Sequence, residues 1–196
     1  DGNGFALRSA LASRLDVAPE CLVLGNGSND VLELVTQAFL TPSDEAIYAQ
    51  HAFAVYPLAS HARGAKGVVV PAKDHGHDLP AMLAAVTPRT RVVFVANPNN
   101  PTGTWIGATA MEAFVANVPR EVVVVLDEAY DEYLAPSDRS RSISWIARYP
   151  NLIVSRTFSK AFGLAGMRVG VMIAAPAILA PIRRAMPLFN LNVVAV

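Results

Sequence analysis

The sequence predicts an α/β fold, specifically a three-layer α/β/α sandwich with a mainly parallel central sheet. Apolar, β-branched segments of strand length alternate along the 196 residues with segments of helical spacing. The two most apolar segments, residues 92–95 and 122–126, are hydrophobic at consecutive positions instead of alternate ones. Strands of this kind are buried on both faces, as they are in parallel sheets covered by helices.

Seven strands are predicted, separated by the Gly, Pro, Asn and Asp residues that are typical of turns. They cover residues 21–24, 46–49, 67–70, 91–96, 121–126, 152–155 and 169–173. Helical spacing predicts helices at residues 5–15, 29–40, 53–63, 79–86, 108–117, 143–148 and 177–186. Ser28 and Asp78 stand just before two of these helices and are expected to cap them. No repeat or linker interrupts the sequence, so we expect one domain over residues 1–196.

Charge and composition exclude several classes of partner. Lys and Arg number 16, as do Asp and Glu, so no surplus of positive charge is available for nucleic acid or an anionic membrane. The longest nearly apolar segment, residues 169–182, contains Pro176 and Pro181 and is shorter than a membrane span of about 20 residues. The single cysteine, Cys21, cannot form an internal disulfide. We therefore expect a soluble, cytoplasmic protein without nucleic-acid or membrane partners.

The segment after the first strand suits an anion, and ligands of open α/β sheets bind beyond the carboxyl ends of strands. Residues 25–30 read GNGSND and lead directly into a helix. Glycines allow a ligand to approach the backbone, and the amides of a helix start favour a phosphate. A dinucleotide fingerprint is excluded because Asp30 stands where it requires a third glycine. A tight turn capped by Ser28 is the alternative.

Two further strand ends carry side-chain amides and carboxylates. Residues 97–103 read NPNNPTG, and each proline restricts the backbone of the residue before it. We therefore expect the asparagine amides to be fixed for hydrogen bonding, with a stiff turn as the alternative. Asp127, Glu128 and Tyr130 follow the valine-rich strand. The two carboxylates could hold magnesium, but the sequence has no P-loop. One carboxylate could instead pair with a cationic ring, or this strand end could simply be solvated.

The segment after the sixth strand, residues 156–168, combines a lysine with groups that suit a phosphate. Thr157, Ser159 and Arg168 offer hydroxyl and guanidinium groups. Lys160 lies among apolar residues and glycines, surroundings that favour the amine form required of a Schiff-base nucleophile. Taken alone, Lys160 would be interpreted as a surface cation.

In this order, the four segments resemble the class I/II aminotransferases, which are pyridoxal-phosphate enzymes of fold type I. The resemblance extends over essentially the whole chain. Residues 1–8 (DGNGFALR) and 25–30 are most similar to the histidinol-phosphate aminotransferase branch of this family. The resemblance implies pyridoxal 5'-phosphate as cofactor and the exchange of an amino group between L-histidinol phosphate and 2-oxoglutarate in histidine biosynthesis.

The resemblance also implies roles for individual residues around the cofactor ring. Lys160 would form the Schiff base and then move protons between substrate and cofactor. Asp127 would pair with the pyridine nitrogen and keep it protonated. Asn100 and Tyr130 would hydrogen-bond the phenolic oxygen. Phe53 would stack on the ring where relatives carry a tyrosine, so that one hydrogen bond is lost.

The cofactor phosphate would be held at the other end of the site. The resemblance implies that it is bound by the amides of Ser28 and Asn29, the hydroxyls of Thr157 and Ser159, and the guanidinium of Arg168. Tyr56 lies one helical turn after Phe53 and is expected to pack. His75 and His77 lack further ligands at a recognisable spacing, so we predict no metal site.

The resemblance further implies a homodimer, because active sites of this family are shared between neighbouring subunits. Relatives carry a tyrosine just upstream of the DGNG segment and a carboxylate-binding arginine in a C-terminal small domain, and both regions are absent from this sequence. The chain opens on Asp1 instead of Met and stops on an apolar segment. We therefore interpret residues 1–196 as the cofactor-binding large domain of a longer enzyme.

Three alternatives to this function remain open at this point. An aromatic amino acid aminotransferase would keep the chemistry and change the substrate. A threonine-phosphate decarboxylase-like enzyme would keep the cofactor and change the reaction. A non-catalytic effector domain of a transcription regulator would keep only the fold, which the joint presence of Lys160, Asp127, Asn100 and Arg168 makes less attractive.

Overall fold

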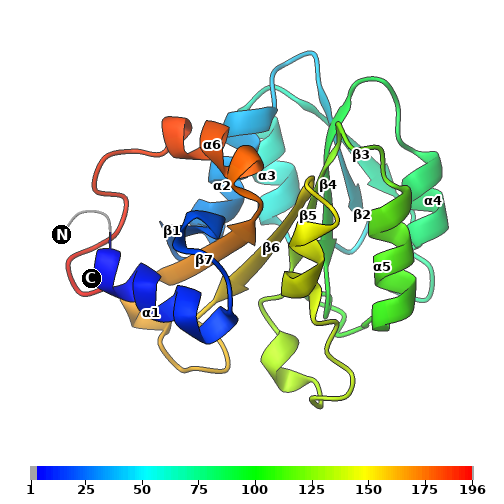
Figure 1. The fold of residues 1–196 in the computed structure, drawn as a ribbon. Helices are drawn as coiled ribbons and strands as arrows, with labels where there is room; N and C mark the ends of the chain where they lie inside the picture. The colour runs from blue at the N-terminus through cyan, green and yellow to red at the C-terminus, as the bar shows by residue number, and fades with distance from the viewer. Residues whose placement is uncertain (1–3, 196) are drawn as a thin grey trace.

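The structure, a computed structural model, describes residues 4–195 and contains all seven predicted strands in one sheet. The strand order is β1-β7-β6-β5-β4-β2-β3 (Figure 1). The strands are β1 (Leu22–Asn26), β2 (Glu45–Ala49), β3 (Lys66–Val70), β4 (Thr90–Ala96), β5 (Val123–Asp127), β6 (Leu152–Thr157) and β7 (Val169–Ala174). Asp1, Gly2 and Asn3 of the DGNG segment lie outside the described residues.

The sheet is mainly parallel, which confirms the prediction from the valine-rich segments. β2 pairs in parallel with β3 and β4, β4 with β5, and β5 with β6. β7 is antiparallel to both of its neighbours, β6 and β1. The carboxyl ends of β4, β5 and β6 therefore meet at one edge of the sheet.

Helices cover both faces of the sheet and complete the predicted three layers. They are α1 (Phe5–Leu15), α2 (Ser28–Phe39), α3 (Val55–Ala62), α4 (Leu79–Ala84), α5 (Ala108–Asn117) and α6 (Pro176–Ala185). Buried residues of α1, α4 and α5 pack with Val124 and Leu126 of β5, whereas those of α2, α3 and α6 pack with Val123 and Val125. β5 is thus buried on both sides. The helix predicted at 143–148 is instead the 3-10 helix η3 (Ser142–Ala147). No helix within residues 4–195 is long and apolar enough to cross a membrane.

The two predicted helix caps have different outcomes. Asp78 caps α4, because its carboxylate accepts a hydrogen bond from the Ala81 amide at 3.1 Å. The prediction for Ser28 is wrong, since Ser28 is the first residue of α2 and Gly27 is the N-cap. Gly27 has a φ of 90°, a conformation that L side chains rarely adopt. Its place before α2 puts the Ser28 and Asn29 amides in the first turn, where amides lack intrahelical partners.

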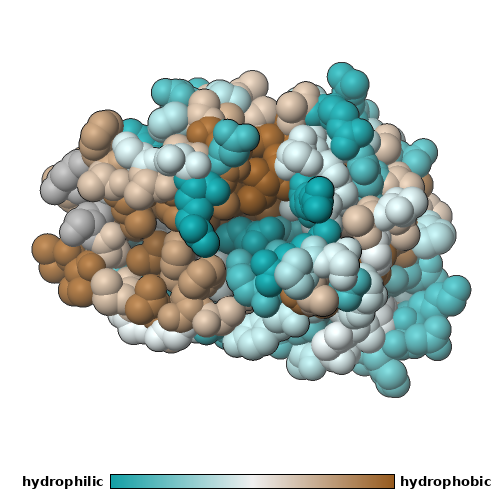
Figure 2. Space-filling model, turned by 60° about the horizontal axis from the view of Figure 1, so that its bottom comes forward, coloured by the Kyte–Doolittle hydropathy of each residue, from teal (hydrophilic) through white to brown (hydrophobic). Residues whose placement is uncertain are grey.

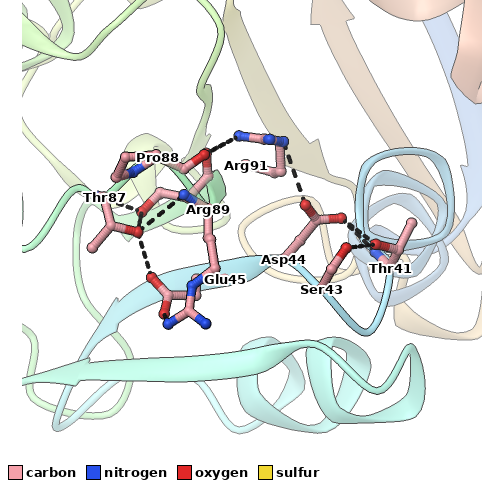
Figure 3. Close-up of polar contacts among 9 residues, drawn as sticks. Thr41, Ser43, Asp44, Glu45, Thr87, Pro88, Arg89 and Arg91 are labelled. Atoms are coloured by element: carbon pink, nitrogen blue, oxygen red, sulfur yellow. Dashed lines mark hydrogen bonds and ion pairs between the residues drawn. The ribbon is translucent and has the colours of Figure 1, made fainter.

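A buried carboxylate ties the sheet together at the amino ends of its parallel strands (Figure 3). Glu45, at the start of β2, is 2% exposed and accepts a hydrogen bond from the Thr87 hydroxyl at 2.7 Å. It also forms ion pairs with Arg89 and Lys66. The Thr87 bond holds the pKa of Glu45 below its ordinary value against the effect of burial, and the two cations lower the pKa further.

Glu45→Gln should lower the free energy of unfolding at neutral pH by about 1–2 kcal/mol, because charge-assisted hydrogen bonds are lost. The folded-state pKa of Glu45 is depressed, so its stabilising contribution is present above the ordinary pKa of 4.5 and is lost as the pH falls through the folded value. Urea unfolding at about pH 7 and about pH 3 checks this dependence. An equal loss of stability at both pH values would contradict it.

Candidate active site

A cavity of about 270 Å³ lies beyond the carboxyl ends of β4 and β5, beside the start of α2. The loops after β5 and β6 lie at the bottom of Figure 1, and Figure 2 turns this end toward the viewer, where hydrophilic residues flank a recess. Nine of the predicted site residues line the cavity: Ser28, Asn29, Phe53, Asn100, Asp127, Tyr130, Ser159, Lys160 and Arg168.

Thr157 is the predicted site residue that the structure does not bring into the cavity wall. It is buried at the end of β6, where its hydroxyl oxygen accepts a hydrogen bond from the Ser159 amide at 3.2 Å. The hydroxyl in turn faces the Val169 carbonyl at 3.5 Å. Thr157 therefore supports the turn that carries Ser159.

Asp127 supplies a buried carboxylate to the cavity. It is the last residue of β5 and is 5% exposed. Burial raises its pKa from 3.8 to about 6, although the Tyr56 hydroxyl, Ser155 and the Ala129 amide each favour the anion. Oδ2 accepts a hydrogen bond from Tyr56 at 2.9 Å, whereas Oδ1 is buried without a hydrogen-bond partner among the described residues. This oxygen is suited to a cationic donor placed in the cavity.

Tyr56 has a role that the sequence-based prediction of simple packing missed. Its ring does pack, since it stacks on Phe94 at 4.7 Å and meets Phe53 edge-on at 5.9 Å between centroids. Its hydroxyl, however, donates to Asp127 and belongs to the cavity wall. The pKa of Tyr56 is raised well above 10 by burial and by the Asp127 charge, so the hydroxyl stays a donor. A fully buried tyrosine needs a polar partner, and that requirement could have drawn attention to it.

The end of the cavity that is suited to an anion combines the start of α2 with Arg168. A Cβ added to Gly27 would lie 2.3 Å from Nη2 of Arg168, so only glycine allows the guanidinium to lie against this loop. A Cβ on Gly170 would lie 2.5 Å from the Ser28 nitrogen, which brings β7 close behind the helix start. Arg168 Nη1 also donates to Ser159 Oγ at 3.4 Å. A helix start, a hydroxyl and a guanidinium converge there, as a phosphate requires.

Lys160 and Tyr130 face each other across the cavity. The Lys160 Nζ atom lies 5.4 Å from the centroid of the Tyr130 ring, within cation–π range. The expectation that apolar residues of its own segment shield Lys160 is wrong, because the residue is exposed. Its loop runs along the sheet edge and includes Gly163 and Gly166, where an added Cβ would meet nothing within 4 Å.

The asparagine-rich loop after β4 is held by two of its own side chains, as the sequence predicts. Asn97 exchanges two hydrogen bonds with the backbone of Ile106, at 2.8 and 3.0 Å. Asn99 donates to the His51 carbonyl at 2.9 Å and so joins this loop to the segment before Phe53. The third asparagine, Asn100, is left to line the cavity.

The sheet, the buried carboxylate, the lysine and the helix start beside Arg168 lie together as the sequence predicts, and the sequence profile shows the class of protein. The chain belongs to the family described as aminotransferase class I and II, whose sequence profile matches residues 5–195. It is 57% identical over 195 residues to histidinol-phosphate aminotransferase of Methylobacillus flagellatus and to histidinol-phosphate aminotransferase 2 of Ralstonia nicotianae. These matches cover 100% of this chain and 53% and 52% of the relatives. The chain thus spans about half the length of the curated relatives it matches.

Solved structures agree with this family assignment. The crystal structure of histidinol-phosphate aminotransferase from Sinorhizobium meliloti, in complex with pyridoxal-5'-phosphate, has a TM-score of 0.94 and 31% identity. The match covers 100% of this chain and 53% of that one. L-threonine-O-3-phosphate decarboxylase from Porphyromonas gingivalis has a TM-score of 0.86 at 23% identity, covering 100% of this chain and 57% of that one. The second likeness concerns the fold alone.

Proposed function

We propose that residues 1–196 form the pyridoxal-phosphate-binding large domain of an aminotransferase, which exchanges an amino group between L-histidinol phosphate and 2-oxoglutarate in histidine biosynthesis. The observation that carries this proposal is the unpaired Oδ1 of Asp127, which lies in a cavity that also contains Lys160 and the anion-binding start of α2. Identity of 57% over the whole chain to histidinol-phosphate aminotransferases supports the substrate pair.

The residues of the cavity fit pyridoxal phosphate at three points. The cradle formed by Gly27 and the Arg168 guanidinium, which lies so close to Gly27 that a Cβ there would overlap it, suits the phosphate. The buried Asp127 carboxylate suits a protonated ring nitrogen, because its Oδ1 has no hydrogen-bond partner among residues 4–195. Lys160 is the primary amine of the cavity wall and suits covalent attachment of the aldehyde.

Each residue has a distinct task in the proposed reaction. When bound, pyridoxal phosphate supplies an electron sink for the negative charge that develops on the reacting carbon. Asp127 Oδ1 would accept a hydrogen bond from the ring N–H and hold that proton in place. Lys160 Nζ would move a proton to and from the reacting carbon. Asn100 and Tyr130 would donate to the phenolic oxygen, and Phe53 would contact the ring without adding a hydrogen bond.

The phosphate is held by groups from two elements. The Ser28 and Asn29 amides lie in the first turn of α2, while the Ser159 hydroxyl and the Arg168 guanidinium come from the segment after β6. Thr157 contributes through its hydrogen bond with the Ser159 amide. We also propose a cytoplasmic homodimer without a nucleic-acid partner, the last in line with the zero formal charge.

The substrate proposal is tested by following the visible absorbance of cofactor-loaded protein during single half-reactions. Histidinol phosphate should discharge the bound cofactor at least about 10²-fold faster than phenylalanine, tyrosine or aspartate, because a site that hydrogen-bonds its substrate discriminates against analogues by at least this factor. A preference for phenylalanine would instead assign an aromatic aminotransferase. Release of CO₂ from threonine phosphate would assign a decarboxylase, and cofactor binding without any turnover would favour a non-catalytic effector domain.

A further inference from the structure

Arg156 is a largely buried cation that the proposed chemistry does not use. It follows Ser155 on β6, and its side chain is 18% exposed. Residues 152 and 154, which have the same parity along the strand, pack with the α1, α4 and α5 side of the sheet. Residue 153 packs with the α2, α3 and α6 side, to which the Tyr56 ring of the cavity wall belongs. Because strand side chains alternate, Arg156 projects from the face opposite the Tyr56 side of the cavity.

The Arg156 guanidinium binds three carboxylates of one short segment, the residues directly after β5. Nη2 pairs with Glu128, while Nη1 lies 3.1 Å from Asp131 Oδ2 and 3.0 Å from Glu132 Oε1. Glu128 and Asp131 are themselves buried, at 1% and 5% side-chain exposure. The Glu132 contact is a charge-assisted hydrogen bond, and the other two are ion pairs, so one guanidinium links three carboxylates of the segment to β6.

Glu128 is fixed from a second direction as well. Its Oε1 accepts hydrogen bonds from the hydroxyls of Ser140 and Ser142, both at 2.6 Å. Its own amide donates to the Ser155 carbonyl of β6 at 2.9 Å. Residues 128–132 are therefore clamped between β6 and the segment that leads into η3.

Tyr130 lies between the clamped residues. Glu128 and Asp131 stand on either side of it in the chain, and the Asp131 amide closes a turn onto the Glu128 carbonyl at 3.2 Å. Tyr130 lines the cavity opposite Lys160, and Asp127 immediately precedes the clamped segment. Two cavity residues, Asp127 and Tyr130, are thus direct sequence neighbours of carboxylates that Arg156 binds at the back of the sheet.

We infer that Arg156 is a positioning residue: through Glu128 and Asp131 it holds Tyr130 and Asp127 in the orientation that the cofactor site requires. The expected effect of Arg156 on cofactor binding rests on the proposed function. Its effect on the order of residues 128–132 does not. Arg156→Lys is the informative variant, because one ammonium keeps the charge and cannot reproduce the fork that reaches three carboxylates.

The chain offers a matched control at the opposite end of the sheet (Figure 3). There Arg89 pairs with Glu45. Like Glu128, Glu45 is a buried carboxylate that accepts a hydrogen bond from a hydroxyl. Arg89→Lys makes the same chemical change to an ion pair far from the cavity, in which the carboxylate is buried and the arginine side chain is 62% exposed. A general effect of replacing arginine by lysine in an ion pair should appear in both variants.

The experiment compares both variants with the wild type in the full-length protein, using three measurements. Hydrogen exchange of residues 128–134 in cofactor-free protein should be about tenfold faster in Arg156→Lys and unchanged in Arg89→Lys. The pH midpoint of the visible absorbance of bound pyridoxal phosphate should shift only in Arg156→Lys. The dissociation constant of the cofactor should rise about tenfold in the same variant, as is typical when a supporting contact is lost.

Each outcome bears on the inference. If Arg156→Lys lowers the melting temperature and leaves the exchange, midpoint and affinity unchanged, Arg156 is structural and the inference is overturned. If it does not fold, Glu128→Gln replaces it, since glutamine keeps the Oε1 acceptor for Ser140 and Ser142 and removes the charge that pairs with Arg156. The same shifts are expected. If the wild type binds no pyridoxal phosphate, the proposed function fails. The hydrogen-exchange comparison then still shows whether Arg156 holds residues 128–134 in place.

Discussion

Lys160→Ala should abolish covalent attachment of pyridoxal phosphate and lower the rate of amino transfer by about 10⁴-fold or more, because the same amine is attachment point and proton carrier. In the wild type, borohydride treatment followed by peptide mass analysis should place the label on Lys160. The variant should still bind the cofactor, weakly, through the Gly27 and Arg168 cradle and Asp127. Its visible absorbance should then be that of free pyridoxal phosphate.

The small number of lysines makes this test sharp. The chain contains three, at positions 66, 73 and 160. Lys66 pairs with Glu45 at the amino ends of the strands, far along the sheet from the cavity. Lys73→Ala is the matched control, and it should keep both the label and the activity. Label on Lys66 or Lys73 in the wild type, or an unchanged label in Lys160→Ala, would overturn the assignment.

The strands, and the polar residues that follow them in the candidate site, could be predicted from the sequence because both depend on local signals. Runs such as residues 122–126 are apolar at every position and have few alternatives to a strand buried on both faces. The polar residues just after these runs, such as Asp127 and Asn100, are then brought together by parallel pairing. Strand ends therefore indicate most of the nine predicted residues that line the cavity, whereas Phe53 is indicated by the family resemblance alone.

The predictions that were wrong or incomplete depend on contacts between distant residues. Ser28 has the side chain of a good cap, but Gly27, against which the Arg168 guanidinium lies, takes the N-cap position instead. The partner of Tyr56 is 71 positions away, so no local spacing indicates it. The residues clamped by Arg156 are likewise 24 to 28 positions upstream, and their charges alone would be interpreted as a solvated surface.

Asp127→Asn should impair the enzyme and yet stabilise the cofactor-free fold at alkaline pH. Without the carboxylate, the ring nitrogen loses its counter-charge, and the turnover rate should fall by about 10²–10³-fold. The folded-state pKa of Asp127 is about 6, above its ordinary value of 3.8. The protonated carboxyl therefore favours the folded state below pH 3.8, and this contribution is lost as the pH rises through about 6.

Above that range the ionised, buried carboxylate costs the folded state up to about 3 kcal/mol, and asparagine removes this cost. We expect cofactor-free Asp127→Asn to be more stable than the wild type by about 2 kcal/mol near pH 8 and equal to it near pH 4, as measured by urea unfolding. Tyr56→Phe is the control of opposite sign, because losing the hydroxyl that stabilises the anion should destabilise the protein at pH 8 and leave it unchanged at pH 4. If Asp127→Asn instead destabilises the protein at pH 8, the fold already compensates the charge internally. In that case Oδ1 is not held open for a cationic ring, and the central observation behind the proposed cofactor site would fail.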